Sequence, residues 1–141
     1  MRFDLRNALF SLGEFPRTMA CLRDAEALAK KLDDPRRLGR LSVFLSSASL
    51  GVSGRSAEGL SFALNAQAIA ERLGDQELGV CANLCCGMAR QALGDARAAE
   101  ADLRAVVAAL SGERFRERCG LAGFPAVVAR CYLTMLLDSQ A

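Results

Sequence analysis

The chain has 141 residues, a formal net charge of +2, 52% hydrophobic residues and 24% charged residues. This apolar content argues against disorder, and the near balance of 18 basic and 16 acidic residues gives no sign of a nucleic-acid partner. The absence of histidine excludes histidine-based catalytic triads and histidine-ligated metals. Leu and Ala, which favour helices, are far more frequent than β-branched residues, so we expect an all-α fold.

Seven helices are expected in chain order. They span residues 3–11, 16–32, 36–51, 56–72, 76–92, 96–110 and 125–138. Asp34 and Asp75 stand at expected N-cap positions, and Pro35 and Pro125 at first helical positions. We predict one repeat array over residues 1–141 that is built from antiparallel helical hairpins. Its units are hairpins at 3–33, 34–74 and 75–111, an irregular insert at 112–124 and a final helix at 125–138.

An internal repeat supports this organisation. Segments 25–34 and 66–75 share five of ten residues at an offset of 41. The expected turn glycines Gly13, Gly54 and Gly94 recur at spacings of 41 and 40 residues. Glycine supplies the left-handed backbone conformation that ends a helix. A period near forty with two helices per unit is typical of an α-solenoid.

The segment from Gly87 to Asp95 indicates which kind of helical repeat this is. Its sequence, Gly-Met-Ala-Arg-Gln-Ala-Leu-Gly-Asp, resembles the tetratricopeptide pattern Gly-x-Ala-Tyr-x-x-x-Gly-Asp. The resemblance implies that Gly87 allows paired helices to approach closely and that Gly94 forms the turn within the repeat. The chain departs from the pattern at Arg90, where the family has a tyrosine.

Three further segments carry a wider resemblance. Leu5–Phe15, Asp34–Ser42 and Gly112–Pro125 resemble, in order and spacing, the C-terminal repeat region of large bacterial regulators. Those regulators combine a class III adenylate/guanylate cyclase domain, an AAA-type or NB-ARC-like ATPase domain and tetratricopeptide repeats. The resemblance implies that this chain is a fragment of a longer array. It carries over no cyclase carboxylates and no phosphate-binding loop.

The resemblance also implies a concave groove lined by the first helix of each repeat. The corresponding residues are Leu41, Phe44, Ala48, Val52, Cys81, Leu84, Met88 and Gln91. This set is mostly apolar and suits an extended peptide or a partner helix. The alternative is that several of these residues pack between helices, as apolar stripes on helices usually do.

The cysteines and the insert give little sign of chemistry. Six cysteines without a Cys-x-x-Cys motif are expected to be reduced core thiols, so we expect no metal, cofactor or redox role. In the insert, Arg114, Arg116 and Arg118 alternate with Glu113 and Glu117, which predicts a solvated or salt-bridged loop.

We therefore expect a non-catalytic scaffold for protein–protein interaction or regulation, which transmits partner binding to neighbouring domains. The alternative is a small-ligand-sensing domain or an enzyme that uses the groove. The expected partners are a protein, a peptide or adjoining domains, with no nucleic acid and no membrane. Self-association through the apolar final helix is a further expectation. Without an apolar span or a signal-like start, the expected location is the cytoplasm.

Overall fold

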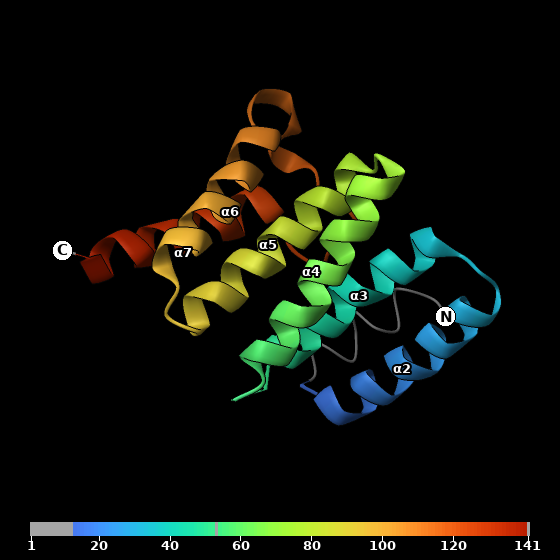
Figure 1. The fold of residues 1–141 in the computed structure, drawn as a ribbon. Coiled ribbons are helices and arrows are strands. Elements are labelled where there is room, and N and C mark those ends of the chain that lie inside the picture. The colour runs from blue at the N-terminus through green and yellow to red at the C-terminus, as the bar shows by residue number, and fades with distance from the viewer. Residues whose placement is uncertain (1–12, 53, 141) are drawn as a thin grey trace.

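The computed structural model describes residues 13–52 and 54–140, and within these ranges it is all-helical (Figure 1). The elements in chain order are α2 (Phe15–Lys31), α3 (Pro35–Leu50), α4 (Ser56–Leu73), α5 (Gln76–Ala92), α6 (Ala96–Ala109), the 3-10 helix η1 (Gly112–Arg116) and α7 (Pro125–Gln140). Every helix predicted from residue 16 onward is present, with ends within two residues of the prediction. The helix expected at 3–11 lies outside the described residues.

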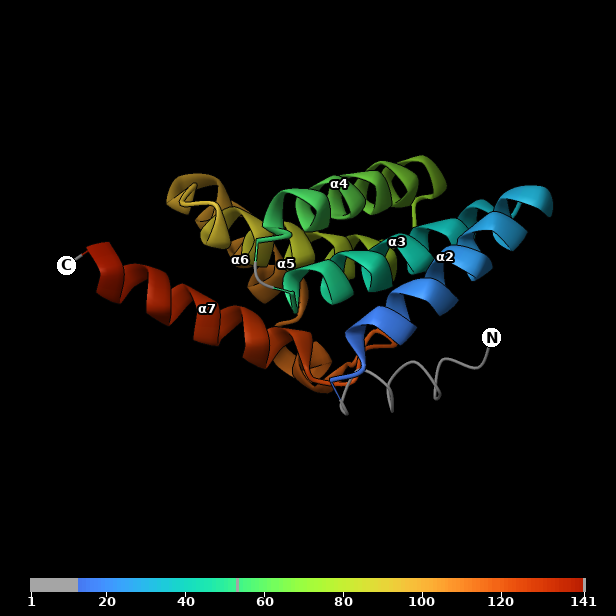
Figure 2. The ribbon, with the colours of Figure 1, turned by 90° about the horizontal axis from the view of Figure 1, so that it is seen from below.

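The helices pack mainly against their neighbours in the sequence. Each α-helix contacts the next one along the chain, and α5 also contacts α3 and α7. In Figure 2, α4 lies on one side of α3 and α5, and α7 lies on the opposite side. The core is continuous through these helices, with Leu22, Leu45, Leu78, Leu103 and Leu110 each fully buried. Helix α5 is therefore the centre of the described structure.

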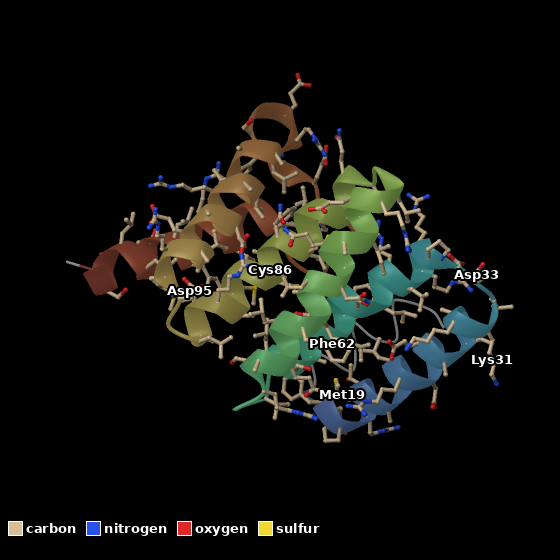
Figure 3. The ribbon with its side chains drawn as sticks, viewed as in Figure 1. Met19, Lys31, Asp33, Phe62, Cys86 and Asp95 are labelled. Atoms are coloured by element: carbon tan, nitrogen blue, oxygen red, sulfur yellow. The ribbon has the colours of Figure 1, made fainter. Side chains whose placement is uncertain are left out.

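Aspartate side chains begin three of the helices. Asp34 accepts a hydrogen bond from the backbone N–H of Arg37 at 3.0 Å, and Asp75 accepts one from Leu78 at 3.0 Å. Both predicted N-caps are thus confirmed. Asp95, in the turn between α5 and α6, caps α6 in the same way (Figure 3). Each carboxylate satisfies an amide that has no partner within its own helix.

Glycine is required at the helix turns and at one helix crossing. Gly13, Gly54 and Gly94 have φ angles of 73°, 83° and 84°, the left-handed region predicted for them. At Gly87 a Cβ atom would lie 2.6 Å from the Cγ of Leu103 on α6. The prediction that Gly87 permits close helix approach is therefore confirmed.

Candidate partner-binding site

Five of the eight predicted groove residues lie in the core. Leu41, Phe44, Ala48, Cys81 and Leu84 are at most 4% exposed. They are buried because α3 and α5 pack against each other and against helices on both sides. The expectation that these five line an open groove is wrong, and the alternative of packing between helices describes them. The other three, Val52, Met88 and Gln91, are partly exposed.

A hollow of about 480 Å³ lies where the C-terminal halves of α3 and α5 face α7. We call it the α3/α5/α7 hollow. It is lined by Ser47, Leu50, Gly51, Met88, Gln91, Ala92, Tyr132 and Met135. Met88 and Gln91 were predicted from the sequence, whereas Val52 is not part of the lining. The structure thus places two of the eight predicted residues in a shared open site.

The 41-residue repeat offset relates the lining residues of α3 to those of α5, although the predicted groove did not use it. Ser47, Leu50 and Gly51 stand 41 residues before Met88, Gln91 and Ala92, which is the offset of the internal repeat. The N-caps Asp34 and Asp75 have the same spacing. The predicted groove instead matched residues of α3 to residues of α5 that lie 40 positions later, as in Leu41 and Cys81. One residue is about 100° around a helix, so this shift selects a different face.

The hollow offers apolar contacts and one polar group that lacks a partner. Ser47 Oγ donates to the carbonyl oxygen of Val43 at 3.0 Å, which uses its hydrogen. Gln91 Oε1 is buried and accepts no hydrogen bond within the described structure. A buried acceptor without a donor is unfavourable. No lining side chain carries a charge.

Arg90, which replaces the tyrosine of the repeat pattern, pairs with Asp102 on α6. Burial raises the pKa of Asp102 above its ordinary value of 3.8, and Arg90 opposes that shift without cancelling it. Burial also raises the pKa of the neighbouring Cys86 thiol to about 12, with Asp102 adding to the effect. Cys86 lies in the interior of the molecule (Figure 3), and it is a neutral thiol near pH 7. This ion pair joins α5 to α6 and lies outside the hollow's lining.

The cysteines divide into two groups. Cys81, Cys85, Cys86 and Cys119 are buried, so the prediction of core thiols is confirmed for these four. It is wrong for Cys21 and Cys131, which are exposed. None of the six, all within the described ranges, forms a disulfide, and the described residues contain no group of three or more side chains placed to hold a metal ion.

Two sets of contacts hold the predicted insert, one within it and one to the central helices. Arg114 donates two hydrogen bonds to the Glu117 carboxylate, at 2.9 and 3.0 Å, which confirms the predicted salt bridge. Further along, the carbonyl oxygen of Cys119 accepts a hydrogen bond from Arg40 on α3 at 2.9 Å. The thiol of Cys81 on α5 donates to the same oxygen at 3.2 Å. The insert is thus anchored to two central helices beside the start of α7.

Comparison with protein-family models, curated proteins and solved structures gave no match. Among the described helices, none combines the length and apolar character needed to cross a membrane. The basis for a functional proposal is therefore the geometry of the α3/α5/α7 hollow and the arrangement of the helices around it.

Proposed function

We propose that the chain is a tetratricopeptide-like repeat module that binds an apolar segment of a partner protein in the α3/α5/α7 hollow. The observation that carries this proposal is the hollow itself. It combines Leu50, Met88 and Met135 with the unpaired oxygen of Gln91. Methionine side chains adapt to varied apolar surfaces, so this lining suits the apolar side chains of a partner.

The repeat character is supported by spacing and packing. The N-caps Asp34 and Asp75 are 41 residues apart, and the left-handed turn glycines recur at 41 and 40 residues. Contacts between α3 and α5 are followed by contacts between α5 and α7, as they would be in a stack of helical hairpins. On this proposal α3, α5 and α7 are the first helices of successive units.

The chemistry of the hollow favours a peptide or a helix over a charged ligand. Its lining is uncharged, and apolar side chains of a bound segment would contact Met88 and Met135. A small apolar ligand is the second candidate, because about 480 Å³ falls within the roughly 300–1,000 Å³ of small-molecule sites. We propose a binding role and no catalytic role.

We further propose that the module belongs to a cytoplasmic bacterial regulator with ATPase and cyclase domains. There, partner binding in the hollow would alter the domains joined to the repeats. This part rests on the sequence resemblance of segments 5–15, 34–42 and 112–125. Its test is whether the intact regulator changes its nucleotide turnover when a partner binds.

The hollow is tested with a peptide selected against the purified protein from a random library. Its binding is then measured by calorimetry to wild type, Met135→Glu and the matched control Leu137→Glu. Both residues lie on α7 and are more than half exposed, at 57% and 54%, but only Met135 lines the hollow. A new carboxylate at an apolar contact is costly to desolvate. We therefore expect Met135→Glu to weaken binding at least tenfold and Leu137→Glu to leave it within about twofold.

Two results would contradict the proposal. One is equal loss of affinity in both variants, which would indicate a general effect of charge on α7. The other is full retention of affinity by Met135→Glu and by a second lining variant, Gln91→Ala. If only a small apolar compound competes with solvent for the hollow and no peptide is selected, the second candidate replaces the first. Phe44→Glu is unsuitable as a test because Phe44 is 2% exposed and its change would disrupt the core.

A further inference from the structure

The buried thiols of Cys81 and Cys119 lie side by side at the junction of α5 and the insert. They are 1% and 5% exposed, and they are 38 residues apart in the sequence. The Cys81 thiol donates a hydrogen bond to the Cys119 carbonyl oxygen at 3.2 Å, and the two thiols are close enough to shift each other's pKa. Two sulfurs on separate segments thus meet in one small volume.

The surroundings of Cys119 hold it in that position. It is the one buried residue of the segment 111–124, so it is the point at which the insert enters the protein. Its φ angle is +50°, which non-glycine residues seldom adopt. Arg40 fixes the Cys119 carbonyl at 2.9 Å and pairs with Glu77 on α5. The unusual backbone conformation is therefore maintained by contacts with α3 and α5.

The contact between the two cysteines makes their thiols unequal. It raises the pKa of Cys81, with burial adding to the effect, and lowers the pKa of Cys119. The lowered pKa favours Cys119 as the attacking thiol. Attack by a thiolate followed by attack of a neighbouring thiol is the usual route to a disulfide.

We propose that Cys81 and Cys119 form an oxidisable pair in which a hydroperoxide generates a disulfide that locks the insert to α5. The Cys119 thiolate attacks the O–O bond of hydrogen peroxide; an S–O bond forms, and the departing oxygen leaves as water after taking a proton. The Cys81 sulfur then attacks the Cys119 sulfur, the S–O bond breaks, and the oxygen leaves as a second water with the Cys81 proton. Both sulfurs are oxidised, and the peroxide is reduced to two waters.

This modification is independent of any partner in the hollow. It fixes the insert immediately before α7, because the insert joins α6 to that helix. Oxidation would therefore add a covalent link between the insert and α5 to the packing and hydrogen bonds that hold the reduced pair.

The test uses the full chain with Cys21→Ser and Cys131→Ser, which removes the two exposed thiols. After treatment with hydrogen peroxide, limited trypsin digestion cuts the insert at Arg114, Arg116 or Arg118. Whichever arginine is cut, Cys119 stays on the C-terminal piece. We expect the two pieces to remain joined on a non-reducing denaturing gel and to separate with reductant. The free-thiol content should fall from four per chain to two.

Three further variants decide between explanations. Adding Cys81→Ala or Cys119→Ala should release the C-terminal piece without reductant, while Cys86→Ala, on the same helix as Cys81, should leave the pieces joined. Circular dichroism verifies that each variant is folded. The proposal is overturned if the pieces separate in the oxidised background protein. It is equally overturned if Cys81→Ala still gives a joined product, because a different thiol would then be the partner. Loss of thiols by over-oxidation without cross-linking also contradicts it.

Discussion

Helix α5 and helix α7 belong to the same stack but have very different surroundings. Helix α5 contacts α3, α4, α6 and α7, and its residues Leu78 and Cys86 are fully buried. Helix α7 contacts mainly α6, with fewer contacts to α5 and η1. It buries Ala129 and Leu136 but leaves Met135 and Leu137 more than half exposed. Apolar residues on α7 are thus divided between the core and a surface that no described element covers.

The connections that precede the two helices account for the difference. Helix α5 begins three residues after the end of α4, through Gly74 and the N-cap Asp75. Helix α7 begins only after the long segment 110–124. A short turn fixes the position of a helix against its predecessor, whereas a long connection allows the next helix to settle farther away. The hollow exists because α7 stands off from α3 and α5 at their C-terminal ends.

The largest expected effect is the loss of stability when a buried leucine is shortened to alanine, and this loss should differ between the α5–α6 contact and α7. Leu103→Ala, at the α5–α6 contact, should lower the free energy of unfolding by about 2–5 kcal/mol. Leu103 is completely buried and lies against Gly87, so its removal leaves a cavity that rigid neighbours cannot fill. Leu136→Ala on α7, where Leu136 is 3% exposed, should cost nearer about 2 kcal/mol because α7 has fewer neighbours and can shift. Urea denaturation measures both.

Equal losses from the two truncations would contradict the comparison, because they would show that α7 is packed as rigidly as α5. Leu137→Ala serves as the control on α7. Leu137 is 54% exposed, so this change should alter stability by no more than about 0.5 kcal/mol.

The second prediction concerns two glycines within α5. Gly87→Ala would place a Cβ 2.6 Å from Leu103 Cγ, and it should cost about 1–3 kcal/mol through overpacking. At Gly79 the nearest heavy atom to a new Cβ is the Cβ of Ala70, at 3.9 Å. Gly79→Ala should therefore stabilise the protein by about 0.5–1 kcal/mol, because alanine favours the helix.

Thermal unfolding of both variants tests whether Gly87→Ala lowers the stability while Gly79→Ala raises it. Combining Gly87→Ala with Leu103→Ala should recover part of the loss caused by the extra methyl group, since the clash partner is then absent. If Gly87→Ala and Gly79→Ala both stabilise, α5 and α6 are less closely packed than the distances indicate.

The third prediction concerns the N-cap that sets the start of α5. Asp75→Ala removes the acceptor for the Leu78 N–H and should cost about 1 kcal/mol. Asp75→Asn keeps an acceptor but loses the ion pair with Arg36, in which the Arg36 side chain is 71% exposed and the Asp75 side chain 11% exposed. An ion pair with one solvated partner contributes no more than about 1 kcal/mol, so we expect Asp75→Asn to cost less than Asp75→Ala. A similar loss in both variants, measured by urea denaturation, would mean that the charge matters more than the cap.

These expectations indicate which features could be predicted from the sequence. Caps, turn glycines and helical periodicity are local, so the helices from 16 onward were predicted to within two residues and Gly87 was assigned correctly. The groove residues depend on which face of each helix is covered by others. An apolar residue such as Phe44 is equally compatible with a core and with a groove. In addition, an error of one residue in the repeat offset selects the wrong face of the helix.

The contribution of α7 to the site depended on long-range packing. Tyr132 and Met135 line the hollow only because the insert sends α7 back along α5. The contact between Cys81 and Cys119 likewise joins segments 38 residues apart. The burial of Cys119 was predicted, but no local pattern in an irregular segment indicates which core residue its thiol will meet.

The smallest expected effect is a pH dependence that arises at the α5–α6 contact. Because burial raises the pKa of Asp102 above 3.8, the folded protein holds its proton more tightly than the unfolded chain does. The resulting stabilisation is present below that ordinary pKa and is lost as pH rises through the pKa of the folded state. In Asp102→Asn this loss should be absent. Wild type should therefore lose stability relative to the variant as pH rises from about 4 toward neutrality.

Urea denaturation at a series of pH values measures this pH dependence, and the Arg90→Gln variant provides a second test of its cause. Arg90 opposes the upward shift, so its removal should raise the pKa of Asp102 further and enlarge the loss of stability with rising pH. Parallel pH profiles for wild type and Asp102→Asn would show that the carboxylate is well solvated at the α5–α6 contact. A smaller loss in Arg90→Gln than in wild type would show that the ion pair, not burial, controls the charge of Asp102. The close packing of α5 against α6 would then not enclose the charged side chain of Asp102.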